Sequence, residues 1–361
     1  MKRKKKIIIA PLDWGLGHAT RCIPIIRACL DRNCEVIIVC SGRSLNLLQT
    51  EFPNLQSINL PAYNIYYQKK GSFIFKIILQ LHKIFKGVRN EHRTLQKIVE
   101  EFKPDLVISD NRYGLYSKKV KCILITHQMM VKIPSIKVLE PVVHWWLMQR
   151  HKKFDAVWIP DVAGFPNISG DLSHKFKLPS YIKHIGILTR FSTPVQIPQK
   201  EFDILVILSG PEPQRTIFEE QILEQSKHRK ERFVIVRGVA ETKTDERIAE
   251  NIRLISFSTA EELFQLILCS DIIISRGGYS TLMDIAHLKK KCIFVPTPGQ
   301  TEQEYLVQQL QKENLVYSIN QKHFNLTTAL SEVEKTKGFF VETNAQEFLK
   351  TLDETLEQVR N

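Results

Sequence analysis

Two glycine-containing loops in this 361-residue chain each follow an apolar run and precede a helical pattern. The first lies in segment 11–21 (PLDWGLGHATR), where His18 follows Gly15 and Gly17. Glycines allow close backbone approach, and the free N–H groups of a helix start favour an anion. A histidine at such a turn can accept a hydroxyl proton near neutral pH, so His18 is a candidate general base and Asp13 a second one. The alternative for His18 is a structural role in capping the turn.

The second loop lies in segment 270–284 (SDIIISRGGYSTLMD) and has the composition of an anion cradle. Its backbone N–H groups and helix dipole can hold a diphosphate, to which an arginine adds positive charge. An acidic residue about one turn later can reach ribose hydroxyls. The alternative is an ordinary N-capped helix with that acid on a solvated face. The residues of this loop that could bind a nucleoside diphosphate are Arg276, Gly277, Gly278, Ser280, Thr281 and Asp284.

The elements that must position these loops alternate between short β-branched runs and longer helical patterns. Near-continuous apolar strands are typical of a parallel sheet covered by helices on both faces. In the first half the predicted strands are 7–10, 36–40, 106–109, 123–126 and 156–159, with helices near 17–32, 72–101 and 135–152. In the second half they are 204–208, 233–236, 253–256, 272–275 and 292–295, with helices near 213–228, 259–269, 279–288 and 301–312. The pattern predicts an α/β protein with two doubly wound, Rossmann-like domains.

The chain length also favours two domains, because single cores rarely grow past about 250–300 residues. Segment 189–200 carries Pro194 and Pro198 without periodicity and is predicted to be a linker. We therefore expect an N-terminal domain over 1–188 and a C-terminal domain over 201–342. The remaining segment, 343–361, is predicted to be a helix that packs on one domain or crosses back to brace the N-terminal domain.

Two such domains would face a cleft at the carboxyl ends of their strands, where open α/β folds bind ligands. Polar residues directly follow two strands of the first half, as Asp110 with Arg112 and as His127 with Gln128. We expect these four residues to bind an acceptor or to assist the base, with hydrogen-bonded structural pairs as the alternative. The first loop lacks the GxGxxG spacing, which disfavours a nicotinamide cofactor.

With both loops in view, the sequence resembles glycosyltransferase family 28 and its relatives, which include the transferase that makes lipid II. The resemblance rests on the Gly-His loop of segment 15–21 and on segment 270–305. It implies the GT-B fold, a UDP-sugar as co-substrate without any other cofactor, and an acceptor held mainly by the N-terminal half. It implies further that Gly15, Gly17 and His18 face the acceptor and the donor phosphates, and that Asp284 holds the ribose.

The resemblance extends to three other places. In the family, a turn equivalent to Ser209 and Gly210 touches the donor phosphates, although two prolines, Pro211 and Pro213, alter that turn here. A polar segment after the next strand contacts the sugar and the nucleotide, which carries these roles to Gln300, Gln303 and Glu304. Glu304 stands where a relative has an amide. His127 matches a histidine of the lipid II enzyme, whereas Gln128 replaces the acidic residue beside it.

The net charge of +13 is concentrated in the first half. Residues 1–190 carry 31 Lys and Arg against 13 Asp and Glu, whereas residues 191–361 carry 20 against 25. This excess suggests an anionic membrane surface or a phosphorylated acceptor, and no motif supports nucleic acid. The helical pattern 73–88 and Trp145-Trp146 with segment 150–153 could dock on a bilayer, although core packing explains the same pattern. No stretch is long enough to span a membrane or serve as a signal peptide. We expect a cytoplasmic protein, peripheral at the inner face.

The sequence thus predicts a glycosyltransferase that moves a hexose or N-acetylhexosamine from a UDP-sugar to a lipid-linked or saccharide acceptor. Direct displacement would invert the anomeric centre, and Arg276 with its helix start would make a metal unnecessary. A nucleotide-sugar hydrolase or epimerase and a catalytically silent nucleotide-sugar-binding subunit remain as alternatives. A nucleic-acid-binding protein is a third.

Overall fold

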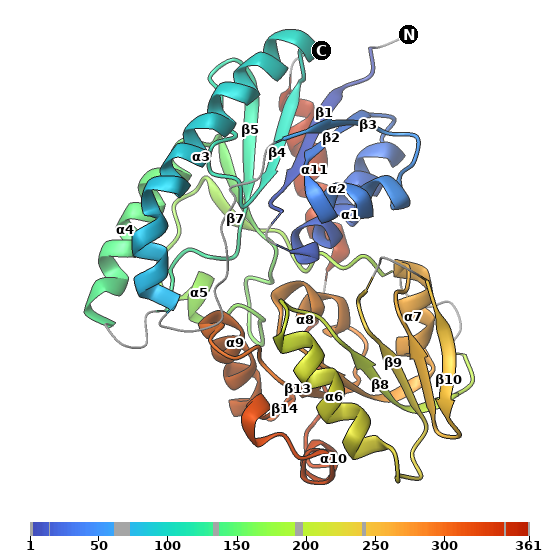
Figure 1. Cartoon of the computed structure of the whole chain (residues 1–361). Helices are drawn as coiled ribbons and strands as arrows, with labels where there is room; N and C mark the ends of the chain where they lie inside the picture. Colours follow the sequence, from blue (N-terminus) through green and yellow to red (C-terminus); the bar gives the residue numbers. More distant parts are fainter. Residues whose placement is uncertain are drawn as a thin grey trace. The chain divides into compact units, whose positions relative to one another are not determined.

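A computed structural model describes residues 3–13, 15–60, 73–132, 137–191, 198–239, 243–342 and 344–359. Residues 192–197 of the predicted linker lie outside the described residues, as do the side chains of residues 73–84 in the predicted amphipathic helix. The chain forms two compact units (Figure 1). The N-terminal unit comprises Met1–Thr189 together with Thr343–Asn361, and the C-terminal unit comprises Arg190–Glu342.

The N-terminal unit is built on a parallel sheet of seven strands in the order β3-β2-β1-β4-β5-β6-β7. Its strands are β1 (Lys6–Pro11), β2 (Glu35–Cys40), β3 (Gln56–Asn59), β4 (Leu106–Asp110), β5 (Lys121–Ile125), β6 (Ala156–Ile159) and β7 (Ile182–His184). Its helices are α1 (Leu16–Asp31), α2 (Gly42–Glu51), α3 (Phe73–Phe102), the 3-10 turn η1 (Lys137–Leu139), α4 (Glu140–His151), α5 (Asp171–His174) and α11 (Ala345–Gln358).

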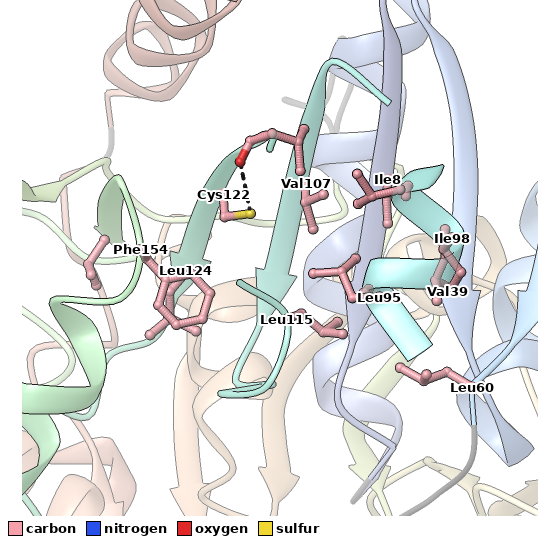
Figure 2. Packing of buried hydrophobic residues seen from close by; sticks show 14 of the residues in the cluster. Ile8, Val39, Leu60, Leu95, Ile98, Val107, Leu115, Cys122, Leu124 and Phe154 are labelled. Carbon is pink, nitrogen blue, oxygen red and sulfur yellow. Dashed lines mark hydrogen bonds between the residues drawn. The ribbon is translucent and has the colours of Figure 1, made fainter. Parts of the chain in front are cut away.

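Helices cover both faces of this sheet because strand residues are apolar in succession and point alternately to the two sides. On one face, Ile8 and Val107 pack with Leu95 and Ile98 of α3 (Figure 2). On the opposite face, Trp158 of β6 packs edge-on against Phe348 of α11, with ring centroids 6.2 Å apart. The C-terminal helix therefore belongs to the core of the N-terminal unit.

The C-terminal unit repeats this architecture with the strand order β10-β11-β9-β8-β12-β13-β14, and only β10 runs antiparallel among the paired strands. Its strands are β8 (Phe202–Ile207), β9 (Phe233–Val236), β10 (Asp245–Ala249), β11 (Ile252–Ile255), β12 (Ser270–Ser275), β13 (Lys291–Phe294) and β14 (Tyr317–Ser318). Its helices are α6 (Gln214–Ser226), α7 (Ala260–Leu268), α8 (Tyr279–Ile285), α9 (Thr301–Lys312), the 3-10 turn η2 (Gln321–His323) and α10 (Leu326–Glu334).

The fold class expected from the sequence is confirmed, and the buried central strands lie where their apolar runs predicted them. Strands β3, β7, β10 and β14, which are the edge strands of the two sheets, were not predicted from the sequence. Edge strands are short and partly solvated, as in β3 and β10, so they carry no continuous apolar run. Helices α2, α5 and α10 were missed as well.

Candidate active site

The candidate catalytic histidine lies in the first turn of α1, at the carboxyl end of β1. Gly15 precedes this helix with a φ of 151°, and no side chain caps the helix start. His18 and Arg21 are three residues apart and therefore share one face of the helix. That face is directed at the end of β4, the strand that pairs with β1. A residue of β4 thus meets α1 although it is 92 positions away in sequence.

Asp110 is that residue, and it joins His18 and Arg21 in one buried cluster. Its Oδ1 lies 2.9 Å from His18 Nδ1, and its Oδ2 accepts a hydrogen bond of 2.7 Å from Arg21 Nε. Arg21 Nη2 donates to Oδ1 as well and lies 2.9 Å from His18 Nδ1. Arg21 and Asp110 are fully buried, whereas 21 % of the His18 side chain is exposed. His18 is therefore the member of this cluster that a ligand can reach.

Electrostatics keeps Asp110 ionised. Burial by itself raises the pKa of this carboxyl, but the charges of Arg21 and His18 and their hydrogen bonds outweigh it and hold the pKa well below its usual range. An ionised carboxylate accepts a strong, charge-assisted hydrogen bond from Nδ1 when that nitrogen carries the proton. In that tautomer the lone pair of His18 is on Nε2, which is the form a general base requires.

Asp110 and Arg112, which were expected to bind the acceptor or to assist the base, both have no exposed surface. Arg112 donates from Nε to the carbonyl of Pro11 at 2.8 Å and from Nη1 to Glu91 Oε1 at 2.8 Å. It thereby anchors the end of β1 to α3. Asp110 contacts His18 and Arg21.

The other N-terminal candidates are His127, Gln128 and Asp13. His127 is 3 % exposed, and its Nδ1 lies 3.5 Å from Arg21 Nη1. Gln128 is half-buried, and its backbone N–H is bonded to Thr126 Oγ1. Asp13 accepts a hydrogen bond of 2.8 Å from Ser41, and only 7 % of its side chain is exposed. His18 is thus the more accessible of the two candidate bases.

The candidate donor residues gather in the C-terminal unit, at the carboxyl ends of the neighbouring strands β8, β12 and β13. Gly277 is required because a Cβ there would overlap Val307 of α9. Gly210 has a φ of 102°, and a Cβ on it would lie 3.3 Å from Thr297 Oγ1. The loops that follow the three strands therefore adjoin, as expected for parallel neighbours.

Exposed and half-buried polar groups line these loops. Gly210 is exposed, and Ser209, Gly278, Ser280, Thr281 and Glu304 are half-buried. Gln303 accepts a hydrogen bond of 2.9 Å from the backbone N–H of Thr297 and donates to Gln300 Oε1. The two glutamines are thus tied to each other and to the loop after β13.

Asp284 lies in α8, and 7 % of its side chain is exposed. Its two oxygens accept hydrogen bonds from the backbone N–H and the Nε of Arg190, at 3.2 and 2.9 Å. Arg190 was missed because the sequence around it resembles a linker.

Arg276 is placed differently from the expectation. Its side chain is 1 % exposed, and it donates hydrogen bonds to backbone carbonyls inside the unit, so it is not at the surface to touch a diphosphate. Burial lowers the pKa of this guanidinium to about 10. Among the described residues, no group of three or more His, Cys, Asp or Glu side chains is arranged to hold a metal ion.

Comparison with known proteins matches both halves of the chain to glycosyltransferase families. Residues 204–359 match the model of the glycosyltransferase family 28 C-terminal domain, and residues 6–143 match a glycosyl transferase family 1 model. An uncharacterized glycosyltransferase of Methanosarcina acetivorans is 23% identical over 318 residues, which are 83% of this chain and 81% of the relative.

A second relative is the UDP-N-acetylglucosamine–N-acetylmuramyl-(pentapeptide) pyrophosphoryl-undecaprenol N-acetylglucosamine transferase of Streptococcus suis. It is 25% identical over 183 residues, which are 45% of this chain and 51% of the relative. Among solved structures, the glycotransferase of kitacinnamycin superposes with a TM-score of 0.67 at 12% identity, covering 99% of this chain and 100% of that one. The sequence matches and the shared fold point to the same class of protein.

Proposed function

Because this chain is a glycosyltransferase of the GT-B fold with a family 28 C-terminal domain, we propose that it transfers a hexose or N-acetylhexosamine from a UDP-sugar to an acceptor hydroxyl. The observation that carries the proposal is the 2.9 Å contact between His18 Nδ1 and Asp110 Oδ1. This contact orients the partly exposed imidazole of His18, near the start of α1, so that it can act as a base. The Streptococcus suis relative, whose name specifies a UDP-linked donor and a lipid-linked acceptor, supports the choice of substrates.

In the proposed reaction, His18 Nε2 takes the proton of the acceptor hydroxyl as its oxygen attacks the anomeric carbon. The new C–O bond forms while the bond from that carbon to the phosphate oxygen breaks, and UDP leaves with the electron pair. Attack opposite the leaving group inverts the anomeric centre. The ionised Asp110 stabilises the imidazolium that forms, which lowers the barrier to proton transfer.

The donor is assigned to the loops after β8, β12 and β13. Backbone N–H groups and hydroxyls of Ser209, Ser280 and Thr281 would face the diphosphate, and Asp284 the ribose. Gln300, Gln303 and Glu304 would contact the sugar. The hydrogen-bond donors among these groups would stabilise the charge of the leaving diphosphate without a metal ion.

The experiment that tests this function is a screen of UDP, TDP, GDP and their sugars for thermal stabilisation of the wild type and of Asp284→Ala. A ligand that binds only the native state raises the melting temperature by mass action. Stabilisation by UDP that Asp284→Ala abolishes supports the proposal. No response to any nucleoside diphosphate contradicts it. Release of free sugar from a UDP-sugar without an acceptor would identify a hydrolase instead.

We further propose that the N-terminal unit contacts an anionic membrane that carries a lipid-linked acceptor. Val138, Val142 and Trp145 are 82%, 60% and 63% exposed and follow one helical face of η1 and α4. Arg150 stacks over Trp146 beside them, at 4.9 Å. Exposed apolar and aromatic side chains next to cationic groups are the features of a helix that lies in a bilayer interface. No described helix is long and apolar enough to cross a membrane.

A further inference from the structure

Arg276 is a buried cation between the loops that are assigned to the donor. Its Nη1 donates to the carbonyl of Val295 at 3.0 Å and approaches that of Pro296 at 3.4 Å. Its Nη2 donates to the carbonyl of Gln214 at 2.8 Å. Val295 and Pro296 follow β13, and Gln214 begins α6 after β8. One side chain at the end of β12 therefore bridges the loops of both neighbouring strands.

The charge of Arg276 has no acidic counterpart within the described part of the chain. The guanidinium carbon lies 4.4 Å from the centre of the Phe218 ring, and the guanidinium forms no ion pair with a described Asp or Glu. Its Nε, although buried, also lacks a hydrogen-bond partner there. Carbonyl dipoles and an aromatic face compensate a buried cation only in part, since a full counter-charge is missing. Arg276 is thus a buried positive charge without a counter-ion among the described residues, and it lies between the loops that are assigned to the donor.

We propose that Arg276 is a positioning residue that holds the loops after β8, β12 and β13 in register and supplies the interior positive charge that favours a diphosphate above them. This inference rests on the proposed function and deepens it, because it assigns phosphate selectivity to a residue that does not touch the ligand. In a water-poor interior a charge acts over a longer range than at a surface, so direct contact is unnecessary. A ligand without phosphates gains nothing from this field.

The test compares binding of UDP and of uridine to wild type, Arg276→Met and Arg276→Lys by titration calorimetry. Arg276→Met removes the charge and the hydrogen bonds at similar length, and we expect UDP affinity to fall at least tenfold while uridine affinity changes less than twofold. Arg276→Lys retains the charge without the planar bridge, and we expect it to recover part of the UDP affinity. In assays of transfer, the donor KM should rise more than the acceptor KM.

Arg229→Met is the matched control, because Arg229 belongs to the same unit but pairs with Glu231 before β9. It should leave UDP affinity unchanged. An Arg276→Met protein that binds UDP like the wild type overturns the inference, and so does an equal loss of UDP and uridine affinity. If the wild type binds no nucleoside diphosphate at all, the proposed function is wrong, and the phosphate selectivity assigned to Arg276 is wrong as well.

Hydrogen exchange tests the bridging role without any ligand. We expect Arg276→Lys and Arg276→Met to accelerate exchange in residues 209–216 and 295–300 relative to wild type, whereas β11 keeps its protection. Uniform acceleration over the whole unit would show a general loss of stability and would overturn the bridge. Unchanged exchange in both loops would do the same.

Discussion

Arg190 holds both oxygens of the Asp284 carboxylate, with its backbone N–H 3.2 Å from Oδ1 and its Nε 2.9 Å from Oδ2. The two residues are 94 positions apart, so folding of the C-terminal unit creates the pair. A carboxylate that is held in this way presents its remaining lone pairs in fixed directions. Orientation of this kind is what recognition of a ribose diol requires.

From this pair we predict that Arg190→Met lowers the affinity for UDP about fivefold, which corresponds to about 1 kcal/mol. The reason is that Asp284 loses its orientation. In an Asp284→Ala background the same substitution should change the affinity less than twofold, because residues in contact are not additive. Calorimetric titration of the four proteins measures the coupling. A gain of affinity in Arg190→Met would show that Arg190 competes with the nucleotide.

For His18 we predict that replacement by Ala lowers kcat by about 10²–10⁴-fold, the usual contribution of a general base. Binding of UDP should stay within twofold of the wild type, because His18 acts on the acceptor hydroxyl in the proposed reaction. His228→Ala is the control, since His228 is exposed in the C-terminal unit. Steady-state kinetics decides the outcome. Full activity in His18→Ala would mean that Asp13 is the general base or that the reaction needs none.

For Asp110 we predict a loss of stability as well as activity. Asp110→Asn leaves the buried Arg21 without its counter-charge, and the free energy of unfolding should fall by about 3–5 kcal/mol. Because the folded pKa of Asp110 is depressed, this contribution is complete above the unfolded pKa and is lost only as pH falls toward the folded value. Urea denaturation at pH 7 measures the difference.

The control for that measurement is Asp353→Asn, which breaks the more exposed pair between Arg32 of α1 and Asp353 of α11. It should cost less than about 1 kcal/mol. The double variant Arg21→Met with Asp110→Leu should be more stable than Asp110→Asn, because no charge is left buried and unpaired. Equal stability of Asp110→Asn and wild type would mean that the cluster is not ionised.

Below neutral pH, His151 is predicted to destabilise the N-terminal unit. His151 has no exposed surface, and neither ring nitrogen has a hydrogen-bond partner in the described structure. Burial lowers its pKa from 6.5 to about 4, and His144 is a smaller cause of this shift. Between these values the unfolded chain binds more protons than the folded one. The free energy of unfolding should therefore fall with falling pH in this window, by at most about 1.4 kcal/mol per pH unit for this residue.

The substitution His151→Phe should reduce that acid dependence, since a phenyl ring keeps the stacking on Tyr113 and has no proton to bind. Urea unfolding at several pH values between 4 and 7 gives the slope for each protein. His228→Phe, at an exposed site, should leave the slope as in the wild type. An unchanged slope in His151→Phe would contradict the prediction.

On the membrane face, we predict that Val142→Glu with Trp145→Glu lowers binding to vesicles of phosphatidylglycerol and phosphatidylcholine at least tenfold. Two carboxylates replace apolar surface and repel anionic lipid. Ile248→Glu is the control, because Ile248 is 46% exposed on β10 of the C-terminal unit. Co-sedimentation with the vesicles reports the bound fraction. Equal binding of the double variant and wild type to the vesicles would show that this face is not the membrane-binding surface.

The sequence by itself determined the class of fold and identified the loops of the candidate site. Apolar runs identified the central strands, because residues buried on both sheet faces must be apolar in succession. The glycines near His18 and at Gly277 identified the two loops, because a requirement for glycine arises from the backbone at that position and is visible in the sequence. The residues that follow central strands are also local features, and they meet at the carboxyl edges of both sheets.

Only the tertiary structure decided how the charged side chains are used. Asp110 is 92 residues from His18, and its sequence neighbours do not reveal that it is buried against α1. Likewise, Arg276 follows a strand as a surface residue could, yet its side chain turns inward to carbonyls of two other loops. Burial and the partner of a charge depend on which distant segments pack around it. That information arises when the sheets and helices assemble, and it distinguishes a residue that contacts a ligand from one that positions the contact.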